Sequence, residues 1–183
     1  MSRAFATPFL GLAAGTLVAL GALGDAAADA PDIRTDGPII HLQDNLDEKD
    51  RLGWCIDTVG RGRSDSLQVH SCKPAPARDR DVTFTYDPDS GQIRSAAYAG
   101  LCATLNEPGG ERRFGLVECD AGDAAQAFDY DEADRRLSPR GQDGQCLAAG
   151  GDSASAGPFM SRTLVLAPCD ETAPELRSWV IRP

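Results

Sequence analysis

The strongest constraint on this chain is a Gly-x-Cys tripeptide that occurs three times. The copies begin at Gly53, Gly100 and Gly144, at nearly equal intervals. A second cysteine follows each copy, and the six cysteines of the chain are all used in this way. Repeats of this length cannot each bury a core alone, so they must stack and share one.

Apolar residues at strand spacing extend the match between the three units. Residues two positions apart share one face of a strand. The apolar pairs before the second cysteines are Leu67 and Val69, Phe114 and Leu116, and Leu164 and Leu166; the pairs after them are Phe84 and Tyr86, Phe128 and Tyr130, and Trp179 and Ile181. Turn residues separate the pairs, and no stretch after residue 31 has a sustained helical period. The pattern predicts an all-β domain with pseudo-threefold symmetry.

The cysteines are expected to pair within each unit. Many connectivities are possible for six cysteines, but equal spacing in repeated units favours pairing within the repeat. The predicted disulfides are Cys55–Cys72, Cys102–Cys119 and Cys146–Cys169. The third pair is more widely spaced, and the extra residues fall in the Gly/Ser/Ala-rich stretch 150–158, which predicts a longer loop. Metal binding is disfavoured because the chain has no CxxC pair.

The first residues have the composition of a secretory signal peptide. Arg3 precedes an apolar stretch at 5–24, and Ala26 to Ala28 offer small residues for cleavage. The alternative is a membrane anchor, but glycines, Thr16 and Pro8 dilute the stretch. The prediction is a secreted or periplasmic protein, in a compartment where disulfides persist. The expected organisation is a signal peptide at 1–28, a short linker at 29–36 and a domain at 37–183, with repeats at about 37–91, 92–135 and 136–183.

Charge and motif content argue against several functions. The net charge of −10 disfavours nucleic acid and anionic membranes as partners. No segment after the leader is apolar enough to predict a membrane span. The sequence has no G-x-S-x-G motif, no P-loop and no His-rich metal motif, so neither catalysis nor a cofactor is predicted.

The repeat set resembles the ricin B-type β-trefoil lectins. That family carries G-x-C, a second cysteine at the end of the next strand, and Q-x-W; the corresponding tripeptides here are Val82-Thr83-Phe84, Gln126-Ala127-Phe128 and Arg177-Ser178-Trp179. The resemblance covers about residues 37 to 183. It implies a β-trefoil of twelve strands, in which three hairpins close a six-stranded barrel. It also implies shallow carbohydrate sites, at most one per repeat.

The resemblance places one complete set of sugar-binding residues in the first repeat. Asp57 lies two residues after Cys55, Gln68 and His70 lie shortly before Cys72, and Asp81 occupies a position where the family often has Asn. A carboxylate accepts hydrogen bonds from neighbouring hydroxyls, and an amide both donates and accepts. A flat ring covers the apolar face of a pyranose. Strand alternation predicts that Gln68 and His70 share the outward face.

The other two repeats lack these residue types. Their corresponding positions hold Thr104, Gly115 and Val117 in the second repeat, and Ala148, Val165 and Ala167 in the third. They are therefore expected to serve as scaffold. An alternative reading of the first repeat is structural, with Asp57 capping a turn and Gln68 and His70 as ordinary exposed strand residues. Trp54 is expected to pack in the core.

Two functions follow from these expectations. The first is a non-catalytic carbohydrate-binding module for a galactose- or xylose-like glycan, with Asp57, Gln68, His70 and Asp81 as its site. The alternative is a degenerate trefoil that acts as an envelope or extracellular protein-interaction module and binds no sugar. The outward Val117 and Val165 would then belong to its contact surface.

Overall fold

The protein is an all-β trefoil in the computed structural model, which describes Met1 and residues 29–74, 81–106 and 114–183. Except for Met1, the predicted signal peptide lies outside the described residues. The first repeat contains β1 (Ile39–Leu42), β2 (Trp54–Thr58), β3 (Leu67–Ser71) and β4 (Phe84–Asp87). The second contains β5 (Gln92–Ser95), β6 (Leu101–Leu105), β7 (Phe114–Glu118), the short helix η1 (Ala124–Gln126) and β8 (Phe128–Asp131). The third contains β9 (Arg136–Pro139), β10 (Gln145–Ala149), β11 (Ala154–Ala156), β12 (Phe159–Arg162), β13 (Leu164–Pro168), α1 (Pro174–Arg177) and β14 (Trp179–Arg182).

Each repeat contains one antiparallel hairpin that is closed by its own disulfide. The hairpins are β2–β3, β6–β7 and β10–β13. The predicted pairings Cys55–Cys72, Cys102–Cys119 and Cys146–Cys169 are confirmed. The Gly-x-Cys glycines have φ values of 75°, 80° and 71° in sequence order, a region that residues with a side chain rarely occupy. Their carbonyls accept hydrogen bonds from the second cysteines at 2.9, 2.9 and 2.8 Å. The tripeptide therefore shapes the base of each hairpin.

Three equivalent backbone hydrogen bonds connect the last strand of each repeat to the start of its first strand. The first residue of β4, β8 and β14 donates to the chain just before β1, β5 and β9: Phe84 to Pro38 at 3.0 Å, Phe128 to Gly91 at 2.9 Å and Trp179 to Arg135 at 2.6 Å. The barrel closes where the first strand, β1, pairs antiparallel with the last, β14. The pseudo-threefold arrangement predicted from the repeats is confirmed.

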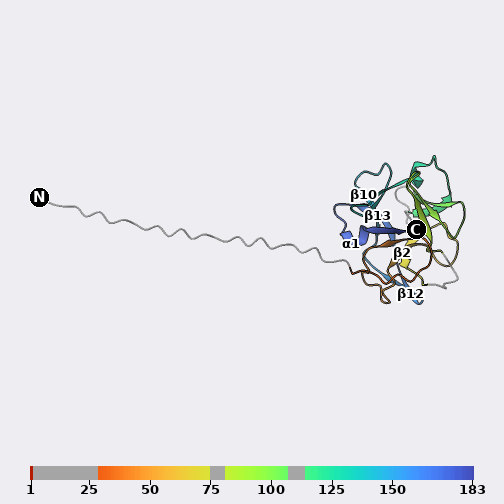
Figure 1. Ribbon diagram of the computed structural model, residues 1–183, viewed down its shortest axis with the longest axis horizontal. Coiled ribbons are helices and arrows are strands. Elements are labelled where there is room, and N and C mark those ends of the chain that lie inside the picture. Colours follow the sequence, from red (N-terminus) through yellow and green to blue (C-terminus); the bar gives the residue numbers. More distant parts are fainter. Residues whose placement is uncertain (2–28, 75–80, 107–113) are drawn as a thin grey trace.

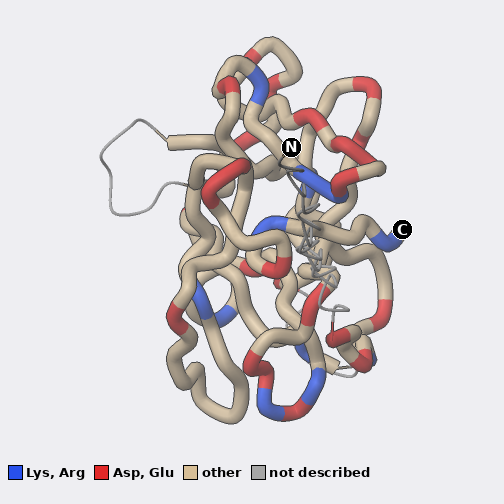
Figure 2. Tube along the Cα trace, turned by 90° about the vertical axis from the view of Figure 1, so that its left-hand side faces the viewer, with Lys and Arg blue, Asp and Glu red and all other residues tan. Residues whose placement is uncertain are grey.

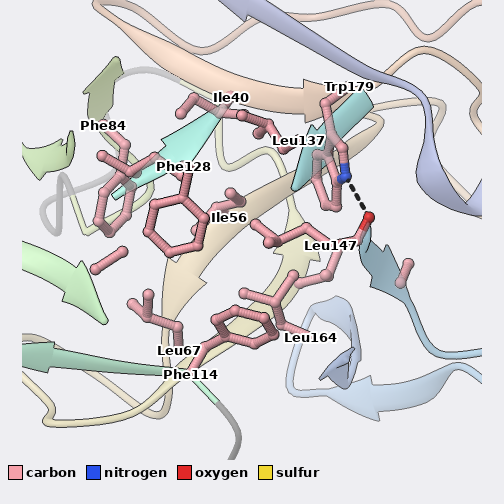
Figure 3. Packing of buried hydrophobic residues seen from close by; sticks show 14 of the residues in the cluster. Ile40, Ile56, Leu67, Phe84, Phe114, Phe128, Leu137, Leu147, Leu164 and Trp179 are labelled. Carbon is pink, nitrogen blue, oxygen red and sulfur yellow. Dashed lines mark hydrogen bonds between the residues drawn. The ribbon is translucent and has the colours of Figure 1, made fainter. Parts of the chain in front are cut away.

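The aromatic residues at the Q-x-W positions meet in one core. Phe84, Phe128 and Trp179 are completely buried, together with aliphatic side chains from all three repeats (Figure 3). The indole N–H of Trp179 donates to the carbonyl of Leu147 at 2.9 Å. Trp54 is also fully buried, as predicted, and its indole N–H donates to the backbone carbonyl of Asn45 at 2.8 Å. Burying one such side chain stabilises the fold by about 2 kcal/mol.

The stretch 150–158 is not simply a loop, which corrects the sequence prediction. It contributes β11, which pairs with β12 to form an extra hairpin. β12 then pairs antiparallel with β3 of the first repeat, with Ser161 opposite His70 and Arg162 opposite Val69. The resulting sheet has the order β11-β12-β3-β2-β1-β14, and Figure 1 labels β2 and β12, the strands on either side of β3. The third repeat thus adds two strands to the twelve that the resemblance implies.

Residues 29–36, predicted as a linker, lie against the first repeat. The amide of Asp32 donates to the carbonyl of Arg51 at 2.6 Å, and the Thr35 hydroxyl donates to the carbonyl of Lys73 at 2.9 Å. Ile33 packs against the cluster around Cys55 and Cys72. Acidic residues lie on loops around the molecule (Figure 2). Among the residues that the structure describes, no helix is long and apolar enough to cross a membrane.

Candidate carbohydrate site in the first repeat

The hairpin β2–β3 places three of the four predicted site residues on one face. Asp57 lies directly opposite Gln68, and Cys55 lies opposite His70. Directly opposite residues of an antiparallel pair project to the same side. The alternate pair, Ile56 and Val69, is buried in the core at 1% and 0% exposure. The predicted alternation along β3 is confirmed.

Lys73 joins two of the predicted carboxylates. Its ammonium nitrogen lies 2.9 Å from Oδ2 of Asp57 and 2.7 Å from Oδ1 of Asp81. His70 Nδ1 lies 3.7 Å from the same Asp57 oxygen. We call Asp57, His70, Lys73 and Asp81 the Lys73 cluster. Three segments therefore bring the predicted residues together, but around a lysine that sequence reasoning missed.

The Lys73 cluster is buried, which corrects the prediction that His70 is exposed. Asp57 and Asp81 are 0% exposed, His70 is 5% exposed and Lys73 is 8% exposed. Gln68 is half-buried, and its amide donates to the carbonyl of Thr58 at 2.9 Å. In this arrangement, Gln68 is the member of the predicted site that reaches the surface most.

Burial sets the protonation of the cluster. It raises the pKa of Asp57 to about 7, outweighing the attraction of the Lys73 ammonium, and repulsion by Asp81 adds to the rise. Burial lowers the pKa of His70, so its imidazole is neutral at neutral pH. Burial also opposes the charge on Lys73, but attraction by Asp57 and Asp81 is stronger and raises the Lys73 pKa. One ammonium is thus shared by two carboxyl groups, and one of them takes a proton near neutrality.

The His70 ring is fixed from two sides. Its Nδ1 lies 3.0 Å from the carbonyl oxygen of Ser71. A carbonyl can only accept, so Nδ1 carries the proton. On the other side, the ring meets Phe159 of β12 edge to face, with centroids 5.7 Å apart and planes at 64°. The hairpin of the third repeat is therefore what covers His70. The wider spacing of Cys146 and Cys169 was the one sequence signal of this contact.

The corresponding positions of the second repeat are largely occupied by contacts within the protein. Thr104 is 7% exposed and faces Gly115 across the hairpin. Ser66 of the first repeat forms a β-bridge with Gly115, and a Cβ added there would lie 3.0 Å from Oδ1 of Asn106. Val117 is 39% exposed.

In the third repeat, Ala148 is fully buried, whereas Val165 and Ala167 are half-buried. These positions offer no carboxylate, amide or ring.

The glutamine of Q-x-W has a structural role where the chain keeps it. Gln126 Oε1 accepts a hydrogen bond from the amide of Asp120 at 3.0 Å, and its Nε2 donates to the carbonyl of Glu118 at 3.1 Å. It thereby ties the end of β7 to η1. Among the described residues, no group of His, Cys, Asp and Glu is arranged to hold a metal ion.

Comparison with known sequences identifies the family. The profile of the Ricin-type beta-trefoil lectin domain matches residues 45–178, which is more than half of the chain. The chain therefore belongs to this family of carbohydrate-binding modules. No curated protein matches the chain.

Solved structures share the fold at low sequence identity. The beta-trefoil lectin of the Vibrio vulnificus hemolysin/cytolysin, solved with N-acetyl-D-lactosamine, is 18% identical with a TM-score of 0.52; the match covers 79% of this chain and 91% of the lectin. A chain of the cytolethal distending toxin from Actinobacillus actinomycetemcomitans is 15% identical with a TM-score of 0.55, over 80% of this chain and 91% of its own. The agglutinin from Abrus precatorius is 13% identical with a TM-score of 0.50, over 82% of this chain and 48% of its own. These likenesses establish the β-trefoil fold.

Proposed function

We propose that this protein is a secreted or periplasmic carbohydrate-binding module without catalytic activity, and that its sugar site lies in the first repeat. The observation that carries the proposal is the convergence of Asp57, Gln68, His70 and Asp81 from separate segments. The family membership supports sugar binding. The three disulfides support export to an oxidising compartment.

Lys73 determines how a sugar enters this site. Its ammonium forms an ion pair with Asp57 and donates a hydrogen bond to Asp81, and the hydroxyls of a galactose- or xylose-like sugar would contact the same carboxylates. A ligand therefore replaces Lys73 at the carboxylates, while the lysine side chain swings toward solvent. Gln68 orients the sugar from the exposed end of the site. Because the ligand competes with an internal ammonium, we expect weak binding of one sugar, with a Kd on the order of millimolar.

A glycan array followed by calorimetry tests this proposal. The protein is purified from an oxidising expression host and compared with Asp57→Asn and with Thr104→Ala, which alters the equivalent position of the second repeat. Wild type and Thr104→Ala should bind the same glycans with equal affinity, and Asp57→Asn should bind at least about tenfold more weakly. Equal binding by wild type and Asp57→Asn on every glycan would show that the first-repeat site is wrong.

A second candidate function follows from the burial of the Lys73 cluster. If Lys73 never leaves the carboxylates, the Lys73 cluster serves only to stabilise the fold, and the module acts by binding a protein. The exposed Val117 is available to such a surface. Recovery of one specific protein partner, together with a blank glycan array, would favour this function over the lectin.

A further inference from the structure

The outward face of the first-repeat hairpin continues into the third repeat. β12 pairs with β3 so that Ser161 lies opposite His70, and Phe159 lies two residues before Ser161 on the same strand. Residues two apart on a strand share a face. Phe159 therefore projects to the same side as His70 and Asp57.

Phe159 retains part of its surface on this face. Its partner in the hairpin is Ala156, and Ala154 lies opposite Ser161. These small neighbours do not cover a large ring, and Phe159 is half-buried rather than buried. The His70 ring, which stands where the family has its aromatic, is 5% exposed and contacts Phe159 with its centroid 5.7 Å away. The exposed aromatic surface at this end of the sheet is thus Phe159.

We propose that Phe159 of the third repeat is the aromatic platform of the first-repeat sugar site and determines which pyranoses it accepts. The inference rests on the function proposed above. A phenyl ring packs against the apolar C–H face of a pyranose, while Gln68 and the carboxylates bind the hydroxyls. The insertion in the third repeat thereby supplies the flat surface that the buried His70 does not offer.

The hairpin that carries Phe159 is held firmly from its opposite face. Arg162 is 7% exposed and donates to the carbonyls of Gly150 and Gly151 at 2.7 Å each. Its guanidinium also pairs with Asp47 and lies 4.8 Å from the centroid of the Trp54 ring. The amide of Met160 donates to the Ser71 hydroxyl at 3.0 Å. These contacts fix Phe159 relative to β3, so it forms a wall of the site and not a lid.

The charges beside Phe159 indicate the class of sugar. Asp57 and Asp81 face the site with one ammonium between them, and the neighbouring imidazole is neutral. The chain as a whole has a net charge of −10. A ligand carboxylate would be repelled by the ionised carboxyl groups of the site once the Lys73 ammonium has moved away from them. The site therefore selects neutral or amine-bearing pyranoses over uronic acids.

Substitutions of Phe159 test the platform. Phe159→Ala and Phe159→Leu remove the flat ring, and Phe159→Trp keeps it. In calorimetry with the glycan that wild type binds best, we expect at least about a tenfold loss for Ala and Leu, and retained affinity for Trp. Val117→Ala, on the exposed surface of the second repeat, is the matched control and should leave affinity unchanged. Circular dichroism and thermal melting check that each variant is folded.

The outcomes separate the platform from the proposed function. If wild type binds a glycan and Asp57→Asn weakens it, but Phe159→Ala and Phe159→Leu bind like wild type, the platform assignment is overturned and the site stands. If wild type binds no glycan, the proposed function itself fails. Galactose, galactosamine and galacturonate are compared directly as probes. Binding of galacturonate as tight as that of galactose would overturn the charge selection.

Discussion

Replacing Asp57 by Asn should change how the stability of the protein depends on pH. Burial raises the pKa of Asp57 from 3.8 to about 7. In the unfolded chain this carboxyl loses its proton near its ordinary pKa, but in the folded protein it keeps the proton until about pH 7. Between these values the folded state holds the extra proton, so the free energy of unfolding falls as pH rises. The stabilisation is complete at low pH and is lost above the folded pKa.

The magnitude follows from the size of the shift. A difference of one pKa unit corresponds to about 1.4 kcal/mol, so a rise from 3.8 to about 7 corresponds to at most about 4 kcal/mol. Asn is nearly isosteric with the protonated acid and does not titrate. The free energy of unfolding of Asp57→Asn minus that of wild type should therefore increase by up to this amount from pH 4 to pH 7.5.

Urea denaturation with the disulfides intact, repeated from pH 4 to pH 8, measures this difference. His70 must be controlled because its pKa is lowered by burial, and its contribution runs in the opposite direction, with stability lost as pH falls. The same comparison in a His70→Gln background should give the same increment. A difference that stays flat across this pH range in both backgrounds would refute the argument, since it would mean that Lys73 keeps Asp57 ionised throughout.

Two further predictions concern the third repeat. Arg162→Met removes the hydrogen bonds to Gly150 and Gly151 and the ion pair with Asp47. We expect the free energy of unfolding in urea denaturation to fall by about 2–4 kcal/mol, and hydrogen exchange in β11 and β12 to become faster. A decrease below about 0.5 kcal/mol would contradict the role of Arg162 as an anchor of this hairpin. The double substitution Cys146→Ala with Cys169→Ala opens a loop of 23 residues and should lower the free energy of unfolding by about 3 kcal/mol. A double variant as stable as wild type would show that the hairpin does not need its disulfide.

The fold was predictable because its determinants recur in the sequence. The Gly-x-Cys glycines fix a positive φ, and the cysteines and strand-spaced apolar residues repeat at matching positions. Three copies of one pattern allow each position to be checked against two others. The residues that build the barrel, such as Phe84, Phe128 and Trp179, were therefore recognisable without a structure.

The candidate site was predictable only in part because its closing residues do not recur. A lysine follows the second cysteine in the first repeat alone, and no motif indicates that the ammonium of Lys73 reaches two carboxylates. The hairpin β11–β12 comes from an insertion in the third repeat that resembles a loop in composition. Its pairing with β3 is a contact between repeats far apart in sequence, and alternation within one strand cannot reveal it.

The most direct test of the central claim is an NMR titration of the ¹⁵N-labelled protein with the best monosaccharide from the array. The account predicts that the largest amide shift changes fall on Asp57, Gln68, His70 and Phe159, so that one binding site spans the first and third repeats. Shift changes confined to the second repeat around Val117, or no saturable changes with any sugar, would contradict it.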